Sequence, residues 1–106
     1  MTYDIALIAL ADPTRRQVFE LLRSGPRCVG ALAEKLPVSR PAVSQHLKVL
    51  KAAQLVADRA EGTRRVYYID PHGLAAVRRW LDGFWEEALT AFAAEAEAEA
   101  ERTKKP

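Results

Sequence analysis

The chain has 106 residues, the length of one domain with a single modest core, and 49% of them are hydrophobic. No apolar run is long enough to span a bilayer, and the start Met-Thr-Tyr-Asp does not resemble a signal peptide, so we expect a cytoplasmic protein without membrane partners. The net charge is only +2, yet residues 12–68 hold eleven of the sixteen Lys and Arg and five of the fourteen acids, a local charge of +6. This distribution favours a polyanionic partner that contacts the middle of the chain.

Two helices and a short third one are predicted before residue 37. Residues 3–11 are apolar around more than one helical face, which in so small a domain suggests cover by a second subunit. Asp12-Pro13-Thr14 combines an N-cap with a proline in the first turn, so a helix should begin there and end at Ser24-Gly25-Pro26. A short helix over residues 30–36 should follow.

The stretch 39–53 carries the strongest functional signal. Ser39 is a natural N-cap, and one face of the helix is apolar at spacings of four and three. The other face holds no acid up to residue 57 and offers side chains of the kinds that bond base edges and phosphates: Arg40, Ser44, Gln45, His46, Lys48 and Lys51. A solvated helix face is the alternative. Two short helices joined by a tight turn predict a helix-turn-helix motif, with this helix as the one that reads DNA.

A β-hairpin is predicted over residues 56–69, because two β-prone arms flank the turn Glu61-Gly62-Thr63. We expect Val66 and Tyr68 to face the core in the second arm. Three arginines gather near the tip: Arg59, Arg64 and Arg65. A hairpin after a helix-turn-helix is a wing, and its arginines should reach the DNA backbone or the minor groove.

The last helix is predicted over residues 72–94, about 34 Å long at 1.5 Å per residue. It carries more aromatic side chains than a small core absorbs, so we predict that it forms a dimer interface with the first helix; the alternative is that these side chains cover their own core. The residues assigned to the interface are Ile5, Ile8, Trp80, Leu81, Phe84, Trp85 and Leu89.

The chain is predicted to divide at residue 94 into a domain, 1–94, and an acidic Ala/Glu tail, 95–106. Alanine and glutamate are both strong helix formers, which favours a helical tail. Glutamates four residues apart repel one another, however, and carboxylates oppose the dipole at a helix C-terminus. We therefore expect the tail to fray.

Four segments together resemble the ArsR/SmtB family of bacterial transcriptional repressors: residues 10–16, 32–36, 43–50 and 64–68. The resemblance covers residues 5–90 in the family's order and spacing. It implies a mainly α fold with a small β-hairpin wing, the winged helix-turn-helix, dimeric through the first and last helices. It also implies binding of double-stranded operator DNA at an imperfect palindrome, with Ser39, Arg40, Ser44, Gln45 and His46 in the major groove.

The metal sites of that family are incomplete in this chain. Their thiolate site needs paired cysteines, but Cys28 is the only cysteine and Gly30 stands where the second would be. A second family site begins with a motif that Asp70-Pro71-His72 resembles, but its other half would fall at Gly83 and Glu86. We therefore expect no metal and no cofactor, and the inducer remains unknown. Cys28 is either a redox switch or, as we prefer, a small buried hydrophobe.

The predicted function is a dimeric, sequence-specific DNA-binding repressor. Lys48, Lys51 and the wing arginines should contact phosphates, while Arg40, Ser44 and Gln45 choose bases. The alternative is a winged-helix protein-interaction module, which the charge of residues 12–68 disfavours. The sequence has no Gly-rich phosphate loop and no recognisable nucleophile–base pair, so we do not expect an enzyme.

Overall fold

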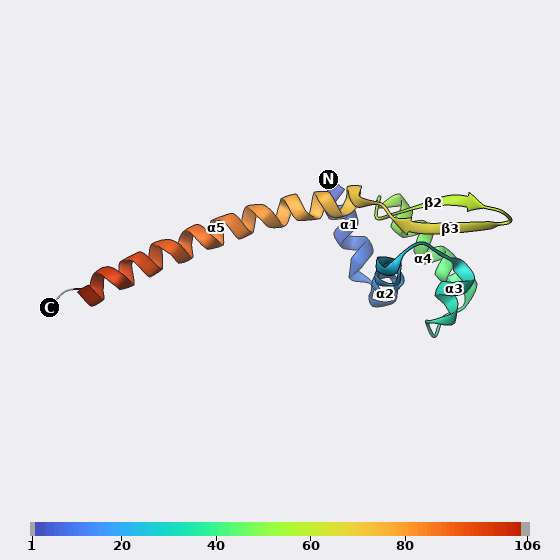
Figure 1. Cartoon of the computed structure of the whole chain (residues 1–106), viewed down its shortest axis with the longest axis horizontal. Helices are drawn as coiled ribbons and strands as arrows, with labels where there is room; N and C mark the ends of the chain where they lie inside the picture. The colour runs from blue at the N-terminus through green and yellow to red at the C-terminus, as the bar shows by residue number, and fades with distance from the viewer. Residues whose placement is uncertain (1, 105–106) are drawn as a thin grey trace.

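The computed structural model describes residues 2–104 (Figure 1). The elements in chain order are α1 (Thr2–Ala11), α2 (Pro13–Leu21), the 3-10 turn η1 (Leu22–Ser24), β1 (Arg27–Cys28), α3 (Val29–Glu34), α4 (Arg40–Ala52), β2 (Val56–Glu61), β3 (Arg64–Ile69) and α5 (Pro71–Lys104). The predicted fold, mainly α with a β-hairpin wing, is confirmed. In Figure 1 the hairpin and α5 extend from opposite ends of the helical body. Within residues 2–104, no helix is both long enough and apolar enough to cross a membrane.

The core lies where α4 meets α2, α3 and the start of the hairpin. Its largest fully buried side chains are Leu32, Leu47, Leu50, Leu55, Val18, Val43 and Val56. Three of them form the apolar face predicted for α4, and that prediction is confirmed. Burying a Leu or Val side chain stabilises a fold by roughly 1.5–3 kcal/mol. The inner face therefore holds α4 in place while its outer face stays in solvent.

α1 is tied to α2 through the residues around Asp12. The Asp12 carboxylate caps α2 by accepting the backbone N–H of Arg15 at 3.0 Å. The guanidinium of Arg15 donates to the Ala9 carbonyl at 3.1 Å, and that of Arg16 donates to the Leu10 carbonyl at 2.9 Å. These carbonyls belong to the last turn of α1, where no intrahelical donor is left for them. Two arginines of α2 thus supply the C-terminal cap that α1 lacks.

The sheet has three antiparallel strands in the order β1-β3-β2. Our expectation for the second arm of the hairpin was wrong by one residue, since Tyr67 and Ile69 pack against the core. Alternate side chains of a strand face opposite sides, and Ile69 pairs with the buried Val56. Tyr68 therefore lies on the other side of the sheet, where the Arg59 guanidinium sits 5.3 Å from its ring centroid.

α5 is a single helix of 34 residues, about 51 Å long at the usual rise. The predicted fraying after residue 94 is wrong for the described part of the tail, because the helix continues to Lys104 without a break. Alanine has the highest helix propensity, and Arg102 donates to Glu99 at 2.8 Å in the last turn, which offsets some of the repulsion between glutamates. The division of the chain at residue 94 stays a prediction.

The two helices assigned to the dimer interface pack together within the protomer. Tyr3 of α1 stacks on Trp80 of α5 with ring centroids 5.5 Å apart, and Trp80 meets Phe84 edge-on at 5.0 Å. Yet every large apolar side chain that is exposed among residues 2–104 lies on α1 or α5: Ile5, Ile8, Leu74, Trp80, Leu81, Phe84, Trp85, Leu89 and Phe92. The alternative was that these side chains cover the core of their own protomer. The listed side chains nevertheless remain exposed within one protomer.

Candidate nucleic-acid interface

The outward face of α4 carries the polar side chains that the sequence predicts for it. Ser39 accepts the backbone N–H of Ala42 at 3.3 Å and so caps the helix. Ser44, Gln45 and Lys48 are exposed, directly opposite an inner face that is fully buried. Hydroxyl, amide and ammonium groups of this kind make the polar contacts by which helices read base edges and phosphates. A rigid, capped helix therefore presents them without further rearrangement.

The six cations predicted to contact DNA differ in how they are engaged. Arg40, Lys48 and Arg64 form no side-chain hydrogen bond or ion pair with any residue in the 2–104 range. Arg59 pairs loosely with Glu61 at 3.5 Å while covering Tyr68. The remaining two, Lys51 and Arg65, share one carboxylate. The first three thus keep all their donors for a ligand.

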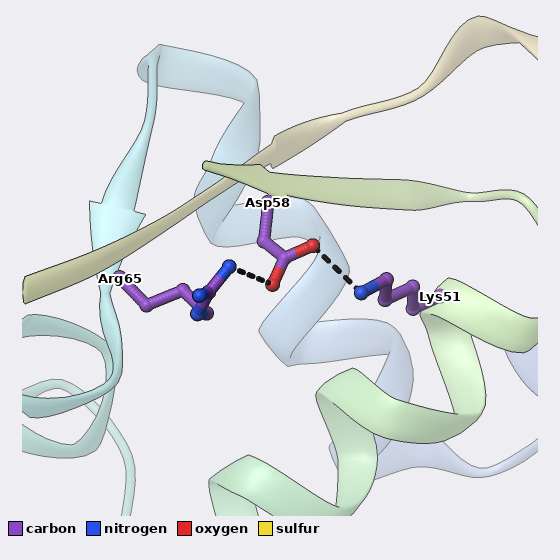
Figure 2. A network of polar contacts seen from close by, with 3 residues as sticks. All are labelled: Lys51, Asp58 and Arg65. Atoms are coloured by element: carbon purple, nitrogen blue, oxygen red, sulfur yellow. Dashed lines mark hydrogen bonds and ion pairs between the residues drawn. The ribbon is translucent and has the colours of Figure 1, made fainter. Parts of the chain in front are cut away.

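That carboxylate belongs to Asp58, which Figure 2 shows between the end of α4 and strand β3. Asp58 Oδ1 lies 2.8 Å from Lys51 Nζ, and Oδ2 accepts from Arg65 Nη1 at 3.0 Å. The Asp58 side chain is only 9% exposed, whereas its two partners are each 57% exposed. The hydrogen bond from Lys51, followed by the bond from Arg65, lowers the pKa of Asp58 against the opposing effect of desolvation. Asp58 therefore joins the end of α4 to strand β3 of the hairpin, a role that its place in the sequence did not indicate.

Replacing Asp58 with asparagine should lower the free energy of unfolding by about 1–2 kcal/mol at pH 7, because two cations lose a charged partner whose side chain is largely shielded from solvent. A carboxylate whose pKa is depressed by folding stabilises the protein above its unfolded pKa, near 3.8, and loses that contribution as the pH falls through the folded value. The difference between wild type and Asp58→Asn should thus be constant from pH 7 to 5 and shrink below pH 4. Urea unfolding at each pH measures it.

Glu61→Gln is the matched control, since it neutralises an acid on the same strand whose ion pair is exposed on both sides. Such pairs contribute about 0.5 kcal/mol or less. Equal destabilisation by the two substitutions, or a difference for Asp58→Asn that persists at pH 3, would contradict a structural role for the Asp58 carboxylate.

His46 lies on the flank of α4 and is half-buried. Its charge helps to lower the pKa of Asp12, although the largest cause is the backbone N–H of Arg15. His46 therefore lies near the start of α2, on the side of Asp12. Its contact with DNA stays a prediction, as do those of the other residues assigned to this surface.

The candidate metal residues lie apart. Cys28 is half-buried at the N-cap position of α3, where the backbone N–H of Ala31 is the largest of the effects that lower the pKa of its thiol. His72 hydrogen-bonds to Asp70 through both its backbone N–H and its ring Nδ1. In the portion of the chain that the structure covers, no three His, Cys, Asp or Glu side chains converge as a metal site requires.

Known proteins share this arrangement. The family model of the bacterial regulatory proteins of the arsR family matches residues 12–58, from the cap of α2 to Asp58. The chain is 61% identical over 100 residues to the HTH-type transcriptional regulator Rv2034 of Mycobacterium tuberculosis, covering 94% of each chain. It is 34% identical to the transcriptional repressor SdpR of Bacillus subtilis, covering 72% of this chain and 84% of SdpR.

A solved structure from Mycobacterium bovis, a homodimeric winged helix-turn-helix DNA-binding domain, superimposes with a TM-score of 0.65 at 32% identity. The match covers 83% of this chain and 82% of that one. The shared elements include the helix-turn-helix and the wing, and the relatives are regulators rather than enzymes. On this sequence and structural similarity, the chain belongs to the ArsR family and is a DNA-binding transcriptional regulator with a winged helix-turn-helix fold.

Proposed function

We propose that the protein is a homodimeric repressor that binds an imperfectly palindromic operator in the cytoplasm and responds to no metal. The observation that carries this proposal is the outer face of α4, where Ser44, Gln45 and Lys48 are exposed over a buried inner face. Asp58 joins the wing to Lys51 near the end of the same helix (Figure 2). In a dimer, two copies of α4 about 34 Å apart would enter successive major grooves.

The exposed apolar surface of α1 and α5 supports the dimer. All nine exposed large hydrophobic side chains of the described chain fall on these two helices. Four of them, Leu74, Leu81, Phe84 and Trp85, line one groove on α5, and soluble monomers rarely expose large contiguous apolar patches. The homodimeric relative from Mycobacterium bovis supports the same assembly. We assign the interface to Ile5, Ile8, Trp80, Leu81, Phe84, Trp85 and Leu89.

Two further observations support repression without a metal. The relative from Bacillus subtilis is a repressor, and its similarity to this chain extends over most of both proteins. The donor set is poor in soft ligands, because Cys28 is the only cysteine and Gly30 follows it two residues later. A metal-responsive regulator changes its affinity for the operator when Zn²⁺ or a chelator is added. We expect no change in operator affinity for this protein.

The proposal is tested by selecting fragments of the source genome that the purified protein retains, then measuring their binding by fluorescence anisotropy. We expect one or a few palindromic fragments, binding that weakens steeply with salt, and a dimer by light scattering. Equal affinity with 50 μM Zn²⁺ and with EDTA would support metal independence. A protein that binds no fragment at any salt concentration would instead be a protein-interaction module.

Gln45→Ala should relax sequence preference. Gln45 is exposed at the centre of the outer face, and an amide that bonds a base edge contributes about 1–3 kcal/mol of discrimination. The ratio of affinities for operator and scrambled duplex should fall by about tenfold or more. Lys48→Ala is the matched control from the same face, expected to weaken both duplexes by a similar factor. A gel-shift series in which the two variants change the ratio equally would refute this division of roles.

A further inference from the structure

A cavity of about 530 Å³ opens between α3, the first residue of α4 and strand β3. Its lining consists of Cys28, Val29, Gly30, Ala31, Glu34, Arg40, Arg64, Arg65 and Tyr67. Three of these residues are arginines and only one is acidic, so the field inside favours an anion. The cavity lies between the two elements that the proposed function puts on DNA, yet no role has been given to it.

Arg40 enters this cavity from the side of α4. A Cβ atom added to Gly30 would lie 3.2 Å from Arg40 Nη2 and 3.4 Å from its Cζ. The guanidinium therefore rests against α3, in space that exists because residue 30 has no side chain. Arg40 is exposed, as Ser44 and Gln45 are, but it alone of the three lines this cavity. Arg40, predicted from sequence to read bases, thus has its guanidinium turned toward α3.

Arg64 enters from strand β3. Its charge also contributes to lowering the pKa of Cys28 in the lining, behind the hydrogen bond from Ala31 and the opposing desolvation. Neither Arg64 nor Arg40 is ion-paired within residues 2–104, although Glu34 lines the same cavity. Arg65 differs, because Asp58 holds its Nη1 at 3.0 Å. Two guanidinium groups from separate elements therefore line this cavity without an ion-pair partner among residues 2–104, and Arg64 also lines the neighbouring cavity beside Arg59.

We propose that Arg40 and Arg64 together hold a single phosphate of the operator backbone in this cavity. The inference rests on the proposed function, because it takes the occupant from the DNA that α4 and the wing approach. A guanidinium presents a planar pair of N–H donors that matches two phosphate oxygens. One phosphate shared by α4 and the wing fixes how the two elements sit along one strand. Arg40 is then a contact that positions α4 and carries no sequence information.

The test uses Arg40→Ala, Arg64→Ala, the double variant and Arg102→Ala, a charge-matched control near the far end of α5 (Figure 1). Affinity for operator and for scrambled duplex is measured by anisotropy at several salt concentrations. Each single substitution should weaken both duplexes about tenfold. The salt slope counts neutralised phosphates, and the proposed dimer holds one such phosphate in each protomer, so the double variant should lower it by about two. Arg102→Ala should change neither quantity.

Gly30→Ala tests the same site without removing a charge. The new methyl group crowds the Arg40 guanidinium, while alanine favours the helix around it. We expect a melting temperature at or above that of the wild type, together with affinity reduced about two- to fivefold for both duplexes. Lost affinity in a protein that has kept its fold points to the placement of Arg40.

Several results would overturn the shared phosphate while leaving DNA binding itself intact. These are unchanged affinity in the single variants, a slope reduced by about four in the double variant, as separate phosphates for the two arginines would give, or a loss confined to the operator with Arg40→Ala, which would make Arg40 a base contact. A free anion is tested by titrating sodium phosphate and pyrophosphate at constant ionic strength. Binding tighter than about 0.1 mM that is lost in Arg40→Ala would assign the cavity to a small ligand instead. If the wild type binds no DNA, the proposed function fails first.

Discussion

Trp85→Glu is expected to convert the dimer to a monomer and to lower operator affinity by about 100-fold or more. Trp85 is 65% exposed in the protomer and lines an apolar groove on α5 with Leu74, Leu81 and Phe84. A carboxylate placed there would have to be desolvated without a partner when two copies meet. A monomer reaches one half-site only, and losing the second linked site removes an avidity of about 10²- to 10⁴-fold.

Light scattering at micromolar concentration measures the mass of the variant, and anisotropy measures its affinity for the operator. Thr90→Glu is the matched control: it adds the same charge to an exposed position five residues further along α5, about 140° around the helix. This control should remain a dimer with unchanged affinity. A Trp85→Glu protein that stays dimeric would show that the apolar groove is not the subunit interface.

Local sequence signals predicted most of the fold, because each of them involves residues that lie within one or two helical turns of one another. The Asp12 and Ser39 caps begin α2 and α4 where expected, and both carboxylate and hydroxyl make the predicted bonds. The spacing of Val43, Leu47 and Leu50 similarly predicted the buried face of α4. Such features depend on neighbours three or four residues away, so an isolated sequence contains them.

Contacts between distant segments could not be predicted in the same way. Asp58 follows the acid-free stretch in sequence, but its bond to Lys51 depends on how the hairpin folds back over α4. The side of β3 that faces the core was misjudged, because both alternating pairs, Val66 with Tyr68 and Tyr67 with Ile69, combine an aromatic and an aliphatic side chain. The turn of Arg40 toward α3 likewise depends on Gly30, ten residues earlier. The roles of single side chains within the site are therefore set by tertiary packing.

The junction of α5 with α4 is another such contact, and it gives the second large expected effect. Gly73 is buried in the first turn of α5, and its N–H donates to the Gln54 carbonyl at 2.8 Å. A Cβ at this position would lie 2.8 Å from the carbonyl oxygens of Ala53 and Gln54 and 2.9 Å from a methyl of Leu55. Two of these three atoms are backbone, so the segment after α4 would have to move.

Gly73→Ala should therefore lower the free energy of unfolding by about 3 kcal/mol, since overpacking of this kind exceeds the gain of roughly 1 kcal/mol from helix propensity. The shift also moves the start of α5, the helix proposed to form the dimer, away from the end of α4. Operator affinity should then fall even at temperatures where the variant remains folded, because the spacing of the two DNA-reading helices depends on this junction. Urea unfolding and anisotropy at 15 °C separate the two effects.

Gly83→Ala provides the matched control, because the same substitution in the same helix meets no atom within 4 Å. It should raise the free energy of unfolding by up to about 1 kcal/mol and leave operator affinity unchanged. If Gly73→Ala proved as stable as Gly83→Ala, the close approach of α5 to the end of α4 would not be what fixes the helices. A Gly73→Ala protein that was destabilised but bound the operator normally when folded would separate the stability of this junction from the spacing of the two DNA-reading helices.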